Sequence, residues 1–569
     1  SLGSSLLSVC PRLKILATSR ESLRVPGEWL YPVPALDSPG ENSSLDPEAA
    51  LNFPALTLFT ERARAVRPNF ELDAENIKAI SAICNQLDGM PLAIELIAAR
   101  MRLITPQALS ERLHEEFLLT DDGMRGVPSR QKSLKDAIDW SYELLSEEEQ
   151  KLFSWLSVFS GGFTLEAAET IFSQAFTQPT VSALIASLFD KSLLQRAFDA
   201  SGEVRYVMLG TIQEFARQRL QETDVEAEIR NWHLAYFLAI AGQAEQALRG
   251  PDQPTWLNRL NSMHTNLRVA LDWAIETGQI ETALEMARRL WWFWSKRSEF
   301  SEGRQWLKRV ISLPDASLFP NLYADVLTQL AHHACLQFGA KEAKPFVKQA
   351  VAIARTSDNR QTLANALMVL GIILAYEENF TAAQSTLEES IALFEQMQDP
   401  WGSAVAMMSL GYAAVKNDDR VTALRLIQEA LMAFRDRGDQ YFQSVCLYET
   451  GNLRAKQGEW EEGLAELRES LELSRELGSK YEIAAGLLRL AETEQYLGQQ
   501  AGAVRLYCAA RNVYDSIGAW HQDEDLKLEK HLAACRDSLG ESAFEEAVEQ
   551  GRVMTMERAI AYALEEQGG

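Results

Sequence analysis

Arg20 is the first residue of the sequence whose type and position could serve chemistry. It follows the apolar segment LKILATS, residues 13–19, which has the composition of a short buried strand. An arginine fixed at the end of such a strand needs an anionic partner, because its guanidinium stays charged. A surface salt bridge to an acidic side chain is the simplest way to supply that partner. Arg20 by itself therefore does not define a site.

The sequence predicts no enzymatic activity for this chain. A GxxxxGK[ST] loop would cradle phosphates and supply a ligand to Mg²⁺, but no Gly-Lys dipeptide occurs in the 569 residues. The chain by itself is therefore not expected to hydrolyse ATP or to hold a cofactor. The seven histidines also form no nucleophile–base arrangement.

A second candidate site consists of aromatic, amide, methionine and lysine residues at recurring offsets in the C-terminal half. Lys416 and Lys456 have the same offset 40 residues apart, so their charges are expected side by side in one groove. A cationic pair next to Tyr and Met suits a peptide carboxylate or a small anion, and a merely solvated face is the alternative. The predicted groove comprises Trp292, Lys296, His332, Asn365, Met368, Tyr376, Met408, Tyr412, Lys416, Tyr448, Asn452, Lys456 and Tyr496.

His332, His333 and Cys335 are the residues that most resemble a metal-binding cluster. Adjacent histidines on a helix point apart, and no second cluster completes a ligand set. No metal site is therefore expected.

The overall composition disfavours broad nucleic-acid or membrane surfaces. The formal net charge is −25 at pH 7, whereas phosphate binding requires clustered Lys and Arg. The apolar run at 290–294 is far shorter than the roughly 20 residues that span a bilayer. Six widely spaced cysteines without a CxxC pair indicate reduced thiols and a cytoplasmic location.

Small residues recur with a period of 40 residues and predict how the groove is built. In each period, a second small residue follows the first by twelve positions and a third follows seven later. Such residues let two helices pack closely and admit the next pair, which predicts tetratricopeptide-like pairs with lengthened helices. The positions are Ala331, Gly371, Gly411, Gly451, Ala491, Ala343, Ala383, Ala423, Gly463, Ala503, Ala350, Ser390, Ala430, Ser470 and Ala510.

A winged helix is predicted ahead of these repeats. Ser146, followed by three glutamates, marks a helix start, because its hydroxyl caps free backbone donors. Further helices, a hairpin with a DASG turn and the helix TIQEFARQRL follow. The third helix, residues 181–194, offers one Lys and one Asp, whereas groove binding needs several cations. Direct DNA binding is therefore not expected.

Several segments together resemble the STAND class of signal-transduction NTPases, also described as NB-ARC or AP-ATPase-like. They are the strand ending in TSR, LDGMPLAIELIAAR at 87–100 and the winged-helix start at 130–169. The likeness is greatest to bacterial regulators that add tetratricopeptide repeats, such as the maltose-regulator and LuxR-type groups. It covers nearly the whole chain and is most specific over about 12–225.

The resemblance implies roles for two residues. Arg20 would bind the terminal phosphate of a nucleotide, and Pro91 would pack on its base, although Pro91 also suits a plain helix start. ATP or ADP with Mg²⁺ would be held mainly by a domain upstream of this chain, which is expected to be the C-terminal part of a larger protein. Leu209 and Gly210 depart from the family, which often has a histidine or acidic residue there.

The predicted fold is mainly α, with a short α/β remnant and an α-α superhelical solenoid. The expected parts are the nucleotide-domain remnant at 1–44, a helical domain at 45–125, a winged helix at 126–225, a helical connector at 226–280 and tetratricopeptide-like repeats at 281–569.

The resemblance implies the sensor part of an ATP-dependent switch in transcription or signalling. A protein or small-molecule inducer would bind the groove, open the switch and allow homo-oligomers to form. The alternative is a constitutive scaffold that binds proteins without nucleotide switching. The sequence does not decide between them, nor does it identify the effector domain.

Overall fold

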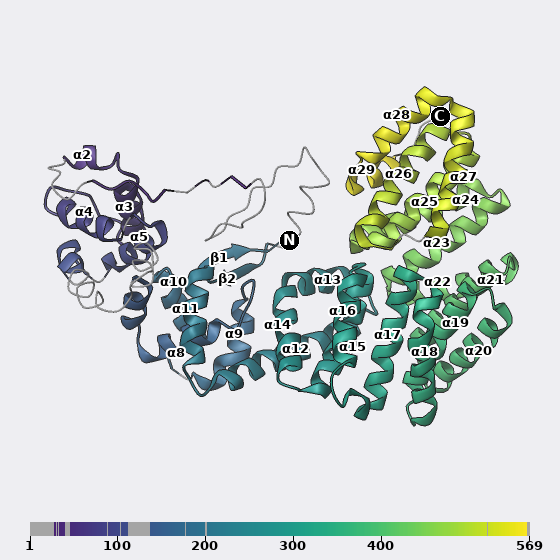
Figure 1. Ribbon diagram of the computed structural model, residues 1–569, viewed down its shortest axis with the longest axis horizontal. Coiled ribbons are helices and arrows are strands. Elements are labelled where there is room, and N and C mark those ends of the chain that lie inside the picture. The colour runs from purple at the N-terminus through teal and green to yellow at the C-terminus, as the bar shows by residue number, and fades with distance from the viewer. Residues whose placement is uncertain are drawn as a thin grey trace. The chain divides into compact units, whose positions relative to one another are not determined.

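The computed structural model describes residues 28, 29, 31, 34–39, 46–87, 89–102, 104–111, 137–176, 178–199, 202–519 and 522–565 (Figure 1). Arg20 and its strand lie outside these residues, so both stay predictions. The described chain is mainly α-helical with one two-stranded sheet, which confirms the predicted fold class. Within it, no helix combines the length and apolar character needed to cross a membrane.

The chain divides into two compact units, and each is described separately. Among described residues, the first unit contains those up to Ser157 together with 173–195 and 208–220. The second contains 158–172, 196–207 and everything from Gln221 onward.

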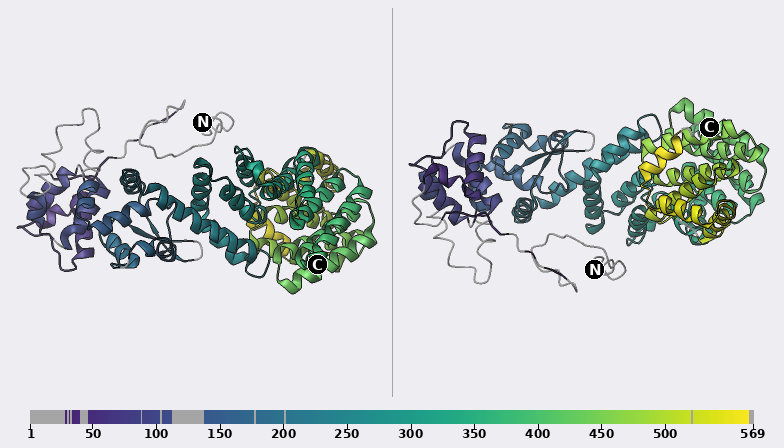
Figure 2. Two further views of the ribbon diagram at one scale, coloured as in Figure 1. Left: turned by 90° about the horizontal axis from the view of Figure 1, so that it is seen from below. Right: turned by 90° about the horizontal axis from the view of Figure 1, so that it is seen from above.

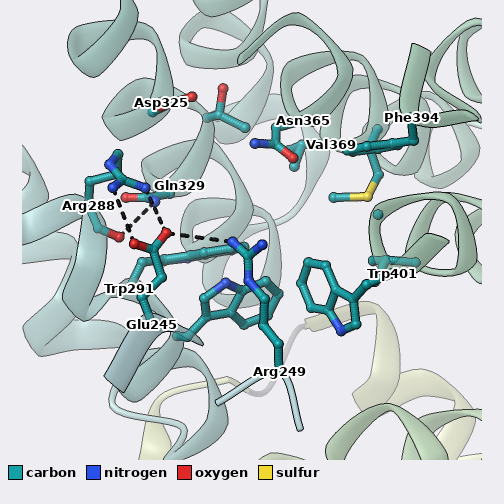
Figure 3. A pocket seen from close by; sticks show the side chains of 15 residues that line it. Glu245, Arg249, Arg288, Trp291, Asp325, Gln329, Asn365, Val369, Phe394 and Trp401 are labelled. Carbon is teal, nitrogen blue, oxygen red and sulfur yellow. Dashed lines mark hydrogen bonds and ion pairs between the residues drawn. The ribbon is translucent and has the colours of Figure 1, made fainter. Parts of the chain in front are cut away.

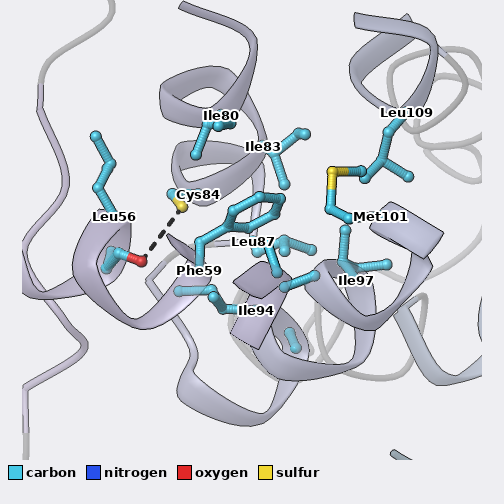
Figure 4. Packing of buried hydrophobic residues seen from close by; sticks show 14 of the residues in the cluster. Leu56, Phe59, Ile80, Ile83, Cys84, Leu87, Ile94, Ile97, Met101 and Leu109 are labelled. Atoms are coloured by element: carbon cyan, nitrogen blue, oxygen red, sulfur yellow. Dashed lines mark hydrogen bonds between the residues drawn. The ribbon is translucent and has the colours of Figure 1, made fainter. Parts of the chain in front are cut away.

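A small helical domain opens the first unit. Proline begins its α-helices α2, α3 and α5, where a preset φ and a missing N–H are tolerated. Phe59, Ile80 and Ile94 are fully buried in its core, and Cys84 Sγ donates a hydrogen bond to the Ala55 carbonyl oxygen (Figure 4). The elements are α2 (Pro47–Ala50), α3 (Pro54–Val66), α4 (Ile77–Gln86), α5 (Pro91–Ala98) and the 3₁₀ helix η1 (Ala99–Arg102).

Helices and a two-stranded sheet follow in the order typical of a winged helix. The predicted start at Ser146 is a capping box, in which the Ser146 hydroxyl accepts from Glu149 N and the Glu149 carboxylate accepts from Ser146 N. A bridge between Phe163 and Tyr206 extends the sheet. The elements are α8 (Glu147–Leu156), α9 (Leu165–Phe172), η2 (Ser173–Ala175), α10 (Val181–Asp190), β1 (Gln195–Phe198), β2 (Val204–Val207) and α11 (Gly210–Gln221).

A helical solenoid forms the rest of the second unit. Three helices, α12 (Glu226–Ala247), α13 (Gln253–Ser262) and α14 (His264–Glu276), lead into it. From α15 to α26 every helix begins 20 residues after the one before, so two helices form each 40-residue repeat. They are α15 (Ile280–Lys296), α16 (Phe300–Ile311), α17 (Pro320–Phe338), α18 (Ala340–Thr356), α19 (Arg360–Tyr376), α20 (Phe380–Gln396), α21 (Pro400–Lys416), α22 (Arg420–Arg437), α23 (Gln440–Gln457), α24 (Trp460–Leu477), α25 (Lys480–Tyr496) and α26 (Gln500–Ile517).

Three further helices end the described chain and break the 20-residue spacing. They are α27 (Gln522–Leu539), α28 (Glu541–Arg552) and α29 (Met556–Leu564), and the short η3 (Ala316–Leu318) lies before α17. The repeat helices stack in pairs, and the array curves round on itself when viewed from above and below (Figure 2).

The fifteen small positions predicted from the sequence are all buried. A Cβ atom added to Gly411 would lie 2.5 Å from Ile427 Cγ1, so a side chain there would collide with the paired helix. Ser390 and Ser470 also donate hydrogen bonds to the carbonyl oxygens of Ala364 and Ser444, at 2.8 and 2.7 Å. Close packing therefore explains the 40-residue rule.

From residue 378 onward, the turns between repeat helices share a residue with left-handed backbone at 20-residue intervals. Glycine occupies it at 438, 458, 478, 498 and 518, with φ between 62° and 88°. Glu378, Gln398 and Asp418 occupy it in the preceding turns, with φ of 60°, 55° and 56°. Side-chain-bearing residues are strained there, so these three turns carry a conformational cost.

Candidate ligand sites in the solenoid

The predicted groove residues separate into two cavities and a buried cluster. Six of them line what we call the C-terminal cavity: Tyr412, Lys416, Tyr448, Asn452, Lys456 and Tyr496. Trp292, Asn365 and Met368 line a second, smaller hollow, the N-terminal cavity. Tyr376 packs against Tyr412 with ring centroids 5.6 Å apart, and half-buried Met408 lines neither cavity.

The C-terminal cavity has the size and lining of a ligand site. Its volume is about 510 Å³, within the range of small-molecule pockets. Helices α21, α23 and α25 supply its inner wall, and α26 and α27 contribute the rest. Five cationic residues line it against two acidic ones, although the chain as a whole has a formal net charge of −25. The cations are Lys416, Lys456, Arg489, Lys527 and Lys530.

Aromatic rings and hydrogen bonds position these charges. Lys416 Nζ lies 5.3 Å from the ring centroids of both Tyr376 and Tyr412. Arg489 Nε donates a hydrogen bond to Tyr448 Oη at 3.2 Å, and Arg489 also forms an ion pair with Glu492. The cavity therefore offers cations on a rigid aromatic wall, an arrangement that suits an organic anion.

The electrostatics favour an incoming negative charge. Loss of hydration, followed by the nearby Arg489 charge, lowers the pKa of Lys456. An anion would offset both effects and stabilise the charged ammonium. Burial also raises the pKa of Tyr448, so its hydroxyl stays neutral and available for hydrogen bonding.

Helix α27 contributes lining residues that the repeat offsets do not predict. Lys527, Lys530 and His531 come from this helix. His531 Nδ1 lies 2.7 Å from Gln495 Oε1, which also accepts a hydrogen bond from Tyr507 Oη at 2.9 Å. Because α27 departs from the repeat spacing, reading offsets along the repeats could not find it.

Lys296 differs from the prediction, because it is fully buried and not exposed in a groove. Its Nζ lies 3.6 Å from Asp439 Oδ1 and 4.3 Å from the Tyr441 ring centroid. Asp439 also accepts hydrogen bonds from Gln253 Nε2 and Trp401 Nε1, at 2.6 and 2.9 Å. Helix α15 thus meets the α22–α23 turn, and burial lowers the pKa of Lys296 to about 8.

The predicted histidine pair also has structural roles. His333 is buried and its Nε2 lies 2.9 Å from Ser295 Oγ, whereas the His332 ring packs edge-on against Trp291 at 5.5 Å. In the part of the chain that the structure describes, no group of three His, Cys, Asp or Glu residues is arranged to hold a metal ion.

Pro91 is the first residue of α5 and is exposed. The preceding Gly89 has φ of 62°, and its carbonyl oxygen accepts a hydrogen bond from Leu36 N at 2.9 Å. A side chain at Gly89 would collide with the Leu36 backbone. Gly89 is therefore packed closely against Leu36. A part of Pro91 in nucleotide binding stays a prediction.

Comparison with known proteins identifies one part of the chain directly. Residues 145–221 match a family model described as a winged helix-turn-helix domain. The chain contains a winged helix-turn-helix domain. In this domain Lys191 pairs with Glu149. Asp190 pairs with Arg102, at the end of η1 in the preceding helical domain, at 2.7 Å.

Relatives extend beyond the winged helix-turn-helix domain. A Mycobacterium tuberculosis protein named "Putative HTH-type transcriptional regulator" is 32% identical over 409 residues, covering 70% of this chain and 44% of that protein. An uncharacterized Mycobacterium bovis protein is 33% identical over 221 residues, covering 38% of this chain and 53% of that protein. The chain thus spans about half the length of these relatives, or less.

Among solved structures, the chain is similar to a Signal Transduction ATPase with Numerous Domains (STAND) protein with a tetratricopeptide repeat sensor from Pyrococcus horikoshii. The TM-score is 0.49 with 17% identity, covering 89% of this chain and 65% of that one. The family match confirms the winged helix predicted from the sequence. The resemblance to STAND regulators with tetratricopeptide repeats stays a prediction.

Proposed function

We propose that the chain is the sensing part of an ATP-dependent transcription regulator and that its C-terminal cavity binds an organic anion as the inducer. The observation that carries this proposal is the set of five cations on the wall of a cavity of about 510 Å³ in an acidic chain. The name of the mycobacterial relative supports a role in transcription.

The ligand class follows from the lining. The cations match a carboxylate, sulfonate or phosphate group, and the tyrosines provide flat apolar surface for the rest of the molecule. A short peptide that presents its terminal carboxylate and a small aromatic acid both meet these requirements. The inducer must bind the open and closed states of the switch with different affinities to change their populations.

The winged helix-turn-helix domain is proposed to act within the switch and not on DNA. Lys191, at the end of α10, pairs with Glu149 inside the domain and is not presented to a phosphate backbone. Regulation of DNA would then need an effector outside this chain, with ATP or ADP and Mg²⁺ bound by an upstream domain. Activation would proceed through homo-oligomers in the cytoplasm.

A transcriptional comparison tests the proposal even while the inducer is unidentified. In the organism that carries the gene, Lys416→Glu with Lys456→Glu should reproduce the transcript profile of a gene deletion, because the cavity loses its anion-binding charges. The charge-matched control is Lys308→Glu with Lys348→Glu, two exposed positions on α16 and α18 that line neither cavity. It should leave the profile unchanged.

The melting temperature separates loss of binding from loss of folding. Because Lys416 and Lys456 are exposed, their replacement should change it by only a degree or two. A wild-type transcript profile in the folded Lys416→Glu, Lys456→Glu protein would refute the sensor assignment and favour the constitutive scaffold.

A further inference from the structure

The N-terminal cavity is a separate feature that the proposed function leaves unused. It has a volume of about 50 Å³ and lies among α12, α15, α17, α19, α20 and α21 (Figure 3). It shares no lining residue with the C-terminal cavity. Trp291, Trp292 and Trp401 supply much of its wall.

Four polar atoms around this cavity are shielded from water and have no hydrogen-bond partner. Arg249 Nε and Trp291 Nε1 are donors, and Asp325 Oδ1 and Gln329 Oε1 are acceptors. Trp291 and Gln329 are each only 8% exposed. Leaving such an atom unpaired costs about 1–3 kcal/mol, so four in one place indicate a site that receives a polar molecule.

The surrounding contacts fix the roles of these atoms. Gln329 Nε2 donates to the Arg288 carbonyl oxygen at 3.0 Å, which leaves Gln329 Oε1 as the acceptor. Glu245 receives two hydrogen bonds from Arg288, at 2.7 and 3.2 Å, and lies 3.5 Å from Arg249 Nη2. The charge of Glu245 is therefore already neutralised. Asp325 lies beside the Thr362 hydroxyl, but its Oδ1 makes no hydrogen bond.

The arrangement requires both a donor and an acceptor in the ligand. Figure 3 shows Asp325 and Arg249 at opposite sides of the cavity. A simple anion would leave Asp325 and Gln329 unpaired, and a simple cation would leave Trp291 and Arg249 unpaired. A molecule that carries both donors and acceptors satisfies all four atoms. A zwitterion in addition matches the carboxylate charge of Asp325 and the guanidinium charge of Arg249.

We propose that the N-terminal cavity binds a small zwitterion of the α-amino acid class. The ammonium group donates to Asp325 Oδ1 and Gln329 Oε1, and the carboxylate accepts from Trp291 Nε1 and Arg249 Nε. The neighbouring indoles and Met368 contact the ligand's apolar atoms. The small volume selects glycine or alanine first.

Isothermal titration of the whole chain with glycine and L-alanine tests this site. At least one should bind with a millimolar or lower dissociation constant. Glycinamide lacks the carboxylate and N-acetylglycine lacks the ammonium, so each should bind at least tenfold more weakly. Failure of both amino acids to bind, as when ordered water alone fills the cavity, would overturn the proposal, as would equal binding of either blocked analogue.

Asp325→Asn provides the matched variant, because it keeps the side-chain shape and removes the charge. It should weaken binding at least tenfold, whereas Asp358→Asn, an exposed position between α18 and α19, should not. Unchanged binding in a folded Asp325→Asn protein would also overturn the proposal. If that variant does not fold, the comparison of analogues on the wild-type chain still decides. The outcome is independent of the C-terminal cavity.

Discussion

At the scale of single residues, the interior of the solenoid contains ionisable groups whose pKa values depend on folding. Glu482 lies at the start of α25, and its Oε1 accepts a hydrogen bond from Tyr441 Oη at 2.7 Å. Burial raises the pKa of Glu482 from 4.5 to about 7. The folded state therefore binds a proton that the unfolded chain releases, and its stability falls as pH rises from 4.5 through 7.

Glu482→Gln should remove this pH dependence while still accepting the Tyr441 hydrogen bond. Relative to wild type, the variant should gain about 2 kcal/mol more unfolding free energy at pH 8 than at pH 5, because one pKa unit corresponds to about 1.4 kcal/mol. Urea denaturation at both pH values measures this difference. Glu461→Gln, on the exposed surface of α24, is the control. An equal gain at both pH values would contradict the expected pKa.

At the scale of elements, a residue with left-handed backbone occupies each turn between repeat helices from residue 378 onward. Gln398 has φ of 55° and is exposed, so its side chain has little packing to lose. Gly498 occupies the corresponding place five turns later with φ of 83°, and an added Cβ would meet no atom within 4 Å. Substitutions at these two positions therefore change backbone strain with little change in side-chain contacts.

Gln398→Gly should stabilise the solenoid by roughly 0.5–1 kcal/mol, because relief of strain exceeds the entropy that glycine adds to the unfolded chain. Gly498→Ala should destabilise it by about 1 kcal/mol for the opposite reason. Thermal or urea unfolding of both variants measures the effects. Destabilisation by Gln398→Gly would show that the turn is not strained.

The repeats could be predicted because their signal is local. Gly411 and the equivalent small residues allow close packing of the two helices within one pair. The same spacing recurs in each repeat of the sequence. The same offsets correctly grouped Lys416 and Lys456, since both project from equivalent helices into one cavity. Helix α27 follows no repeat rule, so its contribution of Lys527 and His531 could not be predicted.

At the scale of the whole solenoid, contacts between distant segments decide which inner positions remain open. Tyr481 N donates to Ser298 Oγ at 2.8 Å across 183 residues, and Lys296 lies against Asp439. These contacts bury the inner face of α15 while the C-terminal cavity stays accessible. Offsets measured along a repeat contain no information about these contacts between distant segments. The prediction that Lys296 is exposed in the groove is wrong for this reason.

The affinity of the C-terminal cavity for a defined organic anion tests the proposed sensor most directly. Fluorescence titration with 8-anilinonaphthalene-1-sulfonate should give a dissociation constant at least tenfold weaker for Lys416→Glu with Lys456→Glu than for wild type, a loss of about 1.4 kcal/mol. Lys308→Glu with Lys348→Glu should bind like wild type. Equal dissociation constants for all three proteins would contradict the assignment of an anion-binding site to this cavity.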